Sequence, residues 1–397
     1  MKDKLNVLVI PTWMPYGKDK NMGVYHQHFC EALSRHQPAN VNVIFIERIP
    51  LKKLLSYITM TKKTAQDENG YRVFRYRMLN VSPVSFSWQT KRYAKKLKKA
   101  YKDYIKQCEK PDVIHAQVCV PAGYASIELA KEINVPVVVT EHSSYFRRYF
   151  SGKEGTFMQS VLKHAYCTCV SKYMLDAFKE KGVPCEQLPN LVDTSLFSPI
   201  ERPAPDDTLK LVSVCALRVG KRIDLMAQAM KKAMETGLVP NIHLTVVGDG
   251  FYGQIYKNAV SECGMSDHVT FAGQVPHDDL EPYYHDAHAL IVASEKETFG
   301  IPGIEALATG MPVISTRNGG MDEYLDESCA ELCSVNDVDD MAQAIGRMYK
   351  RLRSGDFTTG HLLDVASQFD TLHVSEKAMG IYRDLISGKK SPLSPTY

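Results

Sequence analysis

Two glutamates, Glu297 and Glu305, flank a short Gly-Ile-Pro-Gly segment and could do chemistry together. The apolar run before them, residues 288–294, predicts a strand, and Pro302 suits the first position of a helix, where no N–H donor is needed. Because amides at a helix start point outward and attract anions, the segment predicts a phosphate site. Glu305, expected in the first helical turn, would be repelled by a diphosphate unless it accepted hydrogen bonds from ribose hydroxyls. Glu297 is left for a second polyhydroxylated group, so the spacing indicates a nucleotide sugar.

The same two glutamates could instead flank an ordinary surface helix, and their spacing alone favours that interpretation. The residues that follow change this balance. Residues 305–316 predict a helix closed by Gly310 and then a buried strand, which leads into a glycine turn at Gly319-Gly320. Enzymes with parallel α/β sheets form ligand crevices at such strand ends, so a binding site is the better prediction.

The composition is that of an ordinary globular protein. The 397 residues are 44% hydrophobic and 23% charged, which allows two domains with separate cores. A net charge of +3 does not predict nucleic acid as a partner. The ten cysteines lack the spacing of a zinc site, which favours free thiols in a reducing, cytoplasmic compartment. The first residues predict a strand rather than a signal peptide, and no apolar run approaches the ~20 residues of a membrane-spanning helix.

Apolar runs alternate with helical periods along the chain, which is typical of parallel sheets covered by helices. The Pro-rich, polar stretch 198–207 interrupts this alternation and predicts a linker. We therefore predict an α/β fold with two doubly wound domains, residues 1–200 and residues 208–371, followed by a closing helix within residues 372–397.

A Gly-x-Gly-x-x-Gly motif at residues 248–253 follows a predicted strand and raises the alternative of a nicotinamide dehydrogenase. Such a site also needs an acidic residue roughly 20 positions further on, at the end of the next strand. That strand ends at Gly273, and Asp267 lies at its start instead. The motif therefore does not predict a dehydrogenase.

The Glu-Thr-Phe-Gly sequence at Glu297, the Glu-Ala-Leu-Ala-Thr-Gly-Met-Pro-Val run at Glu305 and the later glycine pair resemble motifs of the retaining glycosyltransferases of family 4. These enzymes have the GT-B fold, and the resemblance extends over nearly the whole chain. It implies two Rossmann-like domains that face each other across a cleft. Residues 1–200 would be the acceptor side, residues 208–371 would bind the nucleotide sugar, and the closing helix would pack back on the first domain.

The resemblance also implies which residues bind and react. Lys221 and Arg218 follow the first strand of the second domain, where related enzymes place cations on the donor diphosphate, although Arg218 is shifted along the loop. Fixed cations offset the charge of a departing nucleoside diphosphate, so no metal is expected. The alternative is two solvated loop cations. We predict that the catalytic residues are Lys221, Arg218, His142 and Glu297, and that the donor is bound by Gly23, Gln274, Val275, Phe299, Gly300, Ile301 and Glu305.

His142 follows a predicted strand within Thr-Glu-His. A histidine at a sheet edge is often a packing or hydrogen-bonding residue. The family pattern favours the other interpretation, because related enzymes use this histidine to contact the donor sugar. His115 matches the first histidine of the family's Pro-Asp-Val-x-His-x-His, and Gln117 replaces the second.

The activity that the resemblance implies is glycosyl transfer from a nucleoside diphosphate sugar to an acceptor hydroxyl with retention of configuration, without a further cofactor. The loop at residues 11–15 resembles polysaccharide-building members of the family, which favours a UDP-sugar and a cell-surface polysaccharide or glycolipid product. Two alternatives stay open: a nucleotide-sugar epimerase of the same fold, and a non-catalytic protein that binds sugar nucleotides.

Residues 91–106 predict a lysine-rich helix with tyrosine and aliphatic side chains along one stripe, and a second basic, apolar stretch spans residues 51–63. Many such helices are solvated outer faces. The alternative is a patch that binds anionic lipid, where a lipid-linked acceptor would be found. The protein would then be cytoplasmic and peripheral on the inner face of the membrane.

Overall fold

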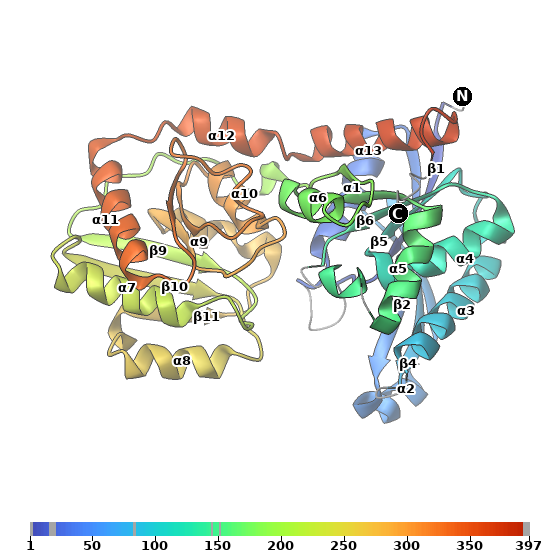
Figure 1. Ribbon diagram of the computed structural model, residues 1–397, viewed down its shortest axis with the longest axis horizontal. Helices are drawn as coiled ribbons and strands as arrows, with labels where there is room; N and C mark the ends of the chain where they lie inside the picture. Colours follow the sequence, from blue (N-terminus) through green and yellow to red (C-terminus); the bar gives the residue numbers. More distant parts are fainter. Residues whose placement is uncertain (1–2, 16–20, 82–84, 144–145, 151, 392–397) are drawn as a thin grey trace. The chain divides into compact units, whose positions relative to one another are not determined.

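The computed structural model describes residues 3–15, 21–81, 85–143, 146–150 and 152–391, and the chain forms two compact units (Figure 1). One unit comprises Met1–Leu191 and Thr371–Tyr397, and the other comprises Val192–Asp370. The first unit therefore ends at Leu191 rather than at residue 200, and the polar stretch 198–207 belongs to the second unit.

Arg202 explains why this polar stretch is not a free linker. Its guanidinium donates hydrogen bonds to the backbone carbonyl oxygens of Tyr284, Ala287 and Thr309, at 2.8, 2.6 and 3.1 Å. Burial lowers the pKa of the guanidinium to about 10, so it stays charged at neutral pH. The stretch is thus bound to the surface of the second unit by contacts with distant residues.

The first unit is built on an eight-stranded sheet with the strand order β3-β4-β2-β1-β5-β6-β7-β8. The strands are β1 (Leu5–Pro11), β2 (Ala39–Pro50), β3 (Lys63–Glu68), β4 (Tyr71–Asn80), β5 (Val113–Gln117), β6 (Val137–Glu141), β7 (Tyr166–Cys169) and β8 (Glu186–Gln187). Neighbouring strands are parallel except β3 and β4, which are antiparallel. All seven residues of β1 are buried, as expected for an apolar strand inside a parallel sheet.

Seven α-helices are described in the first unit. They are α1 (Val24–His36), α2 (Leu54–Thr59), α3 (Phe86–Tyr104), α4 (Tyr124–Ile133), α5 (Gly152–His164), α6 (Lys172–Lys179) and α13 (Thr371–Ile386). Helix α13 comes from the end of the chain and packs against α1. Its residues Val374, Ala378 and Tyr382 join the same core as Phe29 and Leu33 of α1. The closing helix therefore belongs to the first unit.

The second unit has a six-stranded parallel sheet with the order β11-β10-β9-β12-β13-β14. The strands are β9 (Thr208–Val214), β10 (Asn241–Val247), β11 (Val269–Gly273), β12 (Ala289–Val292), β13 (Val313–Thr316) and β14 (Ala330–Cys333). The helices are α7 (Ile223–Glu235), α8 (Gly253–Glu262), α9 (Glu281–His285), α10 (Ile301–Ala308), α11 (Val338–Ser354) and α12 (Thr359–Ser367).

Each unit has a largely parallel sheet, several helices and its own hydrophobic core, so the predicted class of two α/β domains is confirmed. In the part of the chain that the structure describes, no helix combines the length and the apolar character that crossing a bilayer requires.

Candidate active site

The predicted site residues of the second unit follow the carboxyl ends of its strands. Arg218 and Lys221 come after β9, Gln274 and Val275 after β11, and Glu297 after β12. The carboxyl ends of parallel strands share one edge of the sheet, and α/β enzymes bind their ligands at that edge. The fold therefore brings these side chains to the side of the sheet where chemistry is expected.

Lys221 and Glu297 form an ion pair at this edge, with 2.5 Å between Nζ and Oε1. Both side chains are largely buried, with 23% and 17% of their surface exposed. Burial lowers the pKa of Lys221, but the attraction of Glu297 outweighs this effect and the pKa is raised. The ammonium group is therefore charged at neutral pH, with Glu297 as its counter-ion in this structure.

Glu297 is positioned by the glycine turn that follows β13. Its backbone N–H donates to the carbonyl oxygen of Asn318 at 3.0 Å, and its carbonyl oxygen accepts from the N–H of Gly320 at 3.1 Å. A Cβ atom at Gly320 would lie 2.4 Å from the backbone nitrogen of Phe299, so only glycine permits this approach. The glycine turn therefore holds the backbone on which Glu297 stands.

The start of α10 offers two backbone amides. Gly300 precedes the helix with a φ of 84°, and its carbonyl oxygen accepts from the Tyr324 hydroxyl at 2.6 Å. Pro302 is the second helical residue and has no N–H, and the N–H of Gly303 donates to Gly300 O at 2.9 Å. The amides of Gly300 and Ile301 have no acceptor among the described residues, and fewer amides are therefore available to an anion than the sequence predicts.

Glu305 lies deeper than predicted. It is the fifth residue of α10, past the first turn, and its side chain is buried. Its carboxylate accepts hydrogen bonds from the Tyr284 hydroxyl at 2.5 Å and from His277 Nε2 at 2.7 Å. Burial lowers the pKa of His277, but Glu305 more than compensates and the pKa is raised. A ribose contact stays a prediction, and ribose hydroxyls would have to share the carboxylate with these two donors.

The Gly-x-Gly motif packs against the loop that follows β9. A Cβ atom at Gly248 would lie 1.9 Å from the carbonyl oxygen of Cys215, and one at Gly250 would lie 2.3 Å from that of Leu217. Contact between two backbones therefore explains both glycines without a dinucleotide. Arg218 is exposed on the same loop, so its guanidinium is accessible to a ligand.

The three other predicted donor-binding residues, Gln274, Val275 and Phe299, differ in how exposed their side chains are. Gln274 is exposed and Val275 is partly buried, directly after β11. The Phe299 side chain is buried against Tyr324 and Phe369, with ring centroids 5.9 and 5.4 Å away. Any contact between Phe299 and a ligand therefore falls to its backbone.

In the first unit, His142 follows β6 and connects two amide side chains. Its Nδ1 lies 2.9 Å from Asn190 Oδ1, and its Nε2 lies 2.6 Å from Gln117 Oε1. Burial lowers the pKa of His142 to about 3, against the opposing effect of Asn190, so the ring is neutral. A neutral imidazole donates from only one nitrogen, so one of the two amides presents its NH2 group to the ring. Two side chains thus fix the orientation of His142.

The contacts of His115 indicate a structural role rather than a catalytic one. Its Nδ1 lies 2.6 Å from the Tyr382 hydroxyl of α13, and its Nε2 lies 2.7 Å from Thr140 Oγ1. Burial lowers the pKa of His115 to about 3, so this ring is also neutral. His115 therefore anchors the closing helix. Gln117 lies two residues after His115 in β5. Alternate residues of a strand point to the same face of the sheet, so the sequence alone indicates that Gln117 lies near His115 and His142.

Gly23 and His26 lie at the start of α1. Gly23 has a φ of 76°, and a Cβ atom there would lie 2.8 Å from the Trp13 carbonyl group, so glycine is required. The His26 side chain is buried with its ring centroid 4.8 Å from that of His142, and neither of its nitrogens has a hydrogen-bond partner among the described residues. Burial lowers the pKa of His26 as well. No sequence pattern marks an unpartnered buried histidine, so this neighbour of His142 is missed from the sequence.

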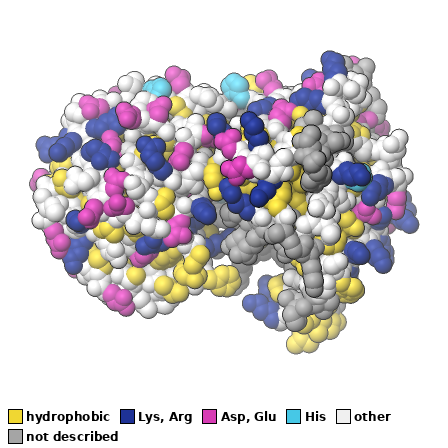
Figure 2. All heavy atoms as spheres, viewed as in Figure 1, with side chains coloured by type: hydrophobic (Ala, Val, Ile, Leu, Met, Phe, Trp, Pro, Cys, Tyr) yellow, Lys and Arg dark blue, Asp and Glu magenta, His cyan; other side chains and the backbone are white. Residues whose placement is uncertain are grey.

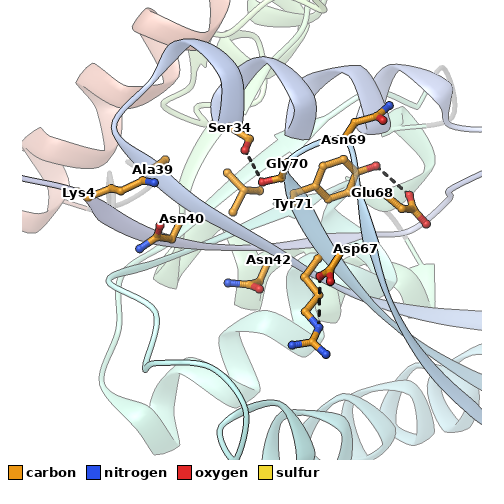
Figure 3. Close-up of a pocket in the computed structure, with 12 residues that line it drawn as sticks. Lys4, Ser34, Ala39, Asn40, Asn42, Asp67, Glu68, Asn69, Gly70 and Tyr71 are labelled. Carbon is orange, nitrogen blue, oxygen red and sulfur yellow. Dashed lines mark hydrogen bonds and ion pairs between the residues drawn. The ribbon is translucent and has the colours of Figure 1, made fainter.

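Of two cavities in the first unit, one is lined by several of these residues and the other by none of them. A hollow of about 10 Å³, the size of one water molecule or one hydroxyl group, is lined by Tyr25, His26, Phe29, His115, Gln117, Thr140, His142, Leu188, Pro189, Asn190 and Leu191. A larger cavity of about 470 Å³ lies between the start of β2 and the β3–β4 hairpin (Figure 3). Some of its polar groups pair with one another, as Ser34 does with the carbonyl oxygen of Gly70 and Tyr71 does with Glu68. It contains none of the predicted site residues, and we assign it no function.

Two family models match the chain. The model described as "Glycosyltransferase Family 4" matches residues 23–196, and the model described as "Glycosyl transferases group 1" matches residues 197–352. Among curated proteins, a component of the phosphatidylinositol N-acetylglucosaminyltransferase of Arabidopsis thaliana is 27% identical over 60% of this chain and 54% of its own length. Alpha-monoglucosyldiacylglycerol synthase of Streptococcus pneumoniae is 25% identical over 66% of this chain and 65% of its own length. The chain thus spans about half to two thirds of these relatives.

Solved structures share the fold over the whole chain. Sucrose-phosphate synthase from Thermosynechococcus elongatus has a TM-score of 0.75 and 20% identity, and the match covers 97% of this chain and 100% of that protein. Anabaena HepE, solved in complex with UDP and glucose, has a TM-score of 0.70 and 17% identity, and the match covers 96% and 100%. At these identities the likeness shows the fold alone.

Proposed function

Because the chain belongs to glycosyltransferase family 4 and has the GT-B fold, we propose that it transfers a glycosyl group from a nucleoside diphosphate sugar to an acceptor hydroxyl with retention of the anomeric configuration. The observation that carries the proposal is the Lys221–Glu297 ion pair at the carboxyl edge of the second sheet, close in sequence to the start of α10. Lys221 and the amides of Gly300 and Ile301 would bind the diphosphate. Glu297 would accept hydrogen bonds from the donor sugar.

The reaction exchanges one bond at the anomeric carbon for another. The bond to the diphosphate oxygen breaks, the acceptor oxygen bonds to the same face of the sugar, and the acceptor proton passes to the departing diphosphate. Negative charge on the diphosphate grows as its bond breaks. Lys221 is charged, and Arg218 lies exposed on the same loop, so both cations can stabilise this charge. We therefore include activity without a divalent metal ion in the proposal.

His142 would contact the donor sugar as a neutral imidazole, and a hydrogen bond to the sugar would have to displace Asn190 or Gln117 from the ring. Burial lowers its pKa to about 3, which makes a proton on both nitrogens unfavourable at neutral pH. Asn190 and Gln117 hold the ring from both sides. A fixed, neutral imidazole suits orientation of a sugar hydroxyl better than proton transfer to the leaving group.

The donor base and the acceptor are narrower proposals. One curated relative is named for a transferase that acts on phosphatidylinositol, the other is named as a synthase of monoglucosyldiacylglycerol, and one structural neighbour was solved with UDP and glucose. These names, together with the loop at residues 11–15, support a UDP-sugar donor and a lipid-linked or saccharide acceptor. The product would belong to glycolipid or cell-surface polysaccharide assembly.

One experiment separates transfer from the epimerase and from a non-catalytic binding protein. The protein is incubated with UDP-, GDP-, ADP- and TDP-sugars, with and without a lipid extract as the acceptor source, and released nucleoside diphosphate is measured. Transfer predicts release that rises when acceptor is added, and an epimerase converts one donor into another without release. A binding protein gives neither result. The matched family models describe glycosyl transferases, which favours transfer.

A further inference from the structure

Helix α3 is the lysine-rich helix that the sequence singles out as a candidate membrane surface. Its apolar stripe is buried, because Tyr93, Leu97 and Tyr104 all lie in the interior of the first unit. One of its lysines, Lys98, is paired with Glu132 of α4 at 2.8 Å. The lysine-rich part of α3 therefore presents mainly charge to the solvent, and the exposed apolar side chains of this helix, Phe86 and Trp88, lie at its start. The apolar stripe that the sequence predicts between the lysines is not a free surface.

The connection between β2 and β3 carries the exposed apolar side chains instead. It consists of a 3-10 turn at Leu51–Lys53 followed by α2, and none of its residues is buried. Leu51, Leu54, Leu55 and Ile58 are 45%, 41%, 82% and 64% exposed. Their spacing of three, four and seven positions puts them on one side of a helix. We name these four residues the α2 stripe.

The α2 stripe lies at a free end of the first unit. Figure 1 shows α2 at the tip of the first unit, beyond the end of β4. In the space-filling view, hydrophobic side chains gather at this end with Lys and Arg side chains beside them (Figure 2). An apolar patch in this position is available to a large flat surface.

The segment that carries the α2 stripe has charges of one sign in its own sequence, and one of its lysines, Lys63, is paired with Asp103 of α3 at 3.3 Å. Residues 48–66 contain no Asp or Glu, and their cations are Arg48, Lys52, Lys53, Lys62 and Lys63. The four lysines are exposed. A second copy of the chain docked through the same stripe would bring these cations together, which is unfavourable. A surface of negative charge over an apolar interior is the complementary partner.

We propose that the α2 stripe docks the protein on a lipid bilayer with anionic headgroups. The leucine and isoleucine side chains enter the boundary between headgroups and acyl chains, and the lysines contact the phosphates. Docking of this kind would bring the first unit to a lipid-linked acceptor. This purpose rests on the proposed function, but binding to vesicles needs neither donor nor acceptor and is tested separately.

Co-sedimentation with vesicles of phosphatidylcholine and phosphatidylglycerol at low salt tests the proposal. The double variant Leu55→Ser, Ile58→Ser should bind about tenfold or more weakly, because each side chain loses its burial in the acyl boundary. Lys52→Gln and Lys53→Gln should each cost about fivefold, and this loss should shrink as salt screens the charges. Both apolar residues are exposed, so their replacement should not affect folding.

Two control variants sharpen the test. Leu372→Ser changes an exposed leucine of α13 in the same unit and should leave vesicle binding unchanged. Replacement of the α3 lysines Lys95, Lys96, Lys98 and Lys99 with glutamine should weaken binding less than replacement of Lys52 and Lys53. UDP affinity, measured by calorimetry, should be the same in all these variants, so failed docking is distinguishable from failure of the proposed function.

Three results would overturn the proposal. The first is a wild-type protein that does not co-sediment with anionic vesicles at low salt. The second is a Leu55→Ser, Ile58→Ser variant that binds vesicles as the wild type does. The third is a variant whose mass in sedimentation velocity falls while its vesicle binding is unchanged, which would assign the α2 stripe to contact between two copies.

Discussion

Replacing Glu305 with alanine tests whether its carboxylate holds the second unit together. The residue is 1% exposed and accepts hydrogen bonds from the Tyr284 hydroxyl and from His277 Nε2. Alanine would leave both donors unpaired in the interior, at a cost of about 1–3 kcal/mol for each. Loss of one member of a buried charged pair falls in a similar range, so we expect Glu305→Ala to lower the free energy of unfolding by roughly 3–5 kcal/mol.

Glu305→Gln is the matched control, because its amide can accept from Tyr284 and donate to a neutral His277. The wild type and the Glu305→Gln variant should also differ in how their stability depends on pH. The pKa of His277 is raised in the folded protein, so its protonated form contributes stability fully below the unfolded value of about 6.5. This contribution is lost as the pH rises through the folded value. The glutamine variant should show a smaller decline, because Asp278 is then the only one of the two carboxylates left to attract the proton.

Hydrogen exchange of α10 peptides in increasing urea is a suitable assay, because a chain with two units need not unfold in one step. The same free energy of α10 exchange in the wild type and in Glu305→Ala would refute the structural role. Calorimetry of the glutamine variant then tests the ribose contact. If the carboxylate also binds ribose, UDP affinity should fall about tenfold or more, whereas Tyr284→Phe keeps the carboxylate and should bind UDP nearly as well as the wild type.

Three further predictions concern catalysis and acid stability. Lys221→Ala should lower turnover more than it raises the donor's Michaelis constant, because the leaving group carries more charge in the transition state, and a pure Michaelis-constant effect would contradict this role. A chelator should leave the rate of nucleoside diphosphate release unchanged; complete loss that one divalent ion restores would show that the cations do not suffice. His115 and His142 have a pKa of about 3 in the fold and about 6.5 when unfolded, so the unfolded chain binds more protons between these values. Below about pH 6 the first unit should therefore lose up to about 1.4 kcal/mol per pH unit for each histidine, and a free energy of α13 exchange that is the same at pH 7 and pH 5, after correction for the intrinsic exchange rate at each pH, would refute it.

The sheet architecture could be predicted because buried parallel strands leave continuous apolar runs in the sequence, as β1 does. The boundary between the two units could not be predicted from the sequence. Residues 198–207 have the proline and charge content of a linker, but Arg202 binds them to carbonyl groups about a hundred residues away. Such long-range hydrogen bonds have no local pattern.

The candidate active site also combines features that the sequence predicts with features that only the structure reveals. Lys221 and Glu297 each follow a predicted strand, so the parallel sheet alone brings them to one edge, although their direct ion pair needs the structure. The donors that bind Glu305 come from a different segment, and neither Tyr284 nor His277 stands at a helical or strand period from it. The glycine turn at Gly320 was predicted as part of the ligand crevice, but its contact with the Glu297 backbone becomes visible only in three dimensions.

The α2 stripe shows what the hydrophobic periodicity of a sequence cannot predict. The spacing of Leu51, Leu54, Leu55 and Ile58 is visible in the sequence, as is the apolar stripe of α3. Both patterns predict an amphipathic helix, and neither says what covers the apolar side. The structure places the α3 stripe in the core and leaves the α2 stripe exposed.

Calorimetric titration of UDP, GDP, ADP and TDP tests the central claim, that the Lys221 edge of the second unit binds a nucleoside diphosphate. The wild type should bind at least one of them, and Lys221→Ala should bind it about tenfold or more weakly, because the diphosphate loses a charged partner. Lys210→Ala is the matched control, since Lys210 is an exposed lysine of β9 paired with Asp286. It should bind the diphosphate like the wild type. If no nucleoside diphosphate binds, or if the two lysine variants bind equally well, the claim is contradicted.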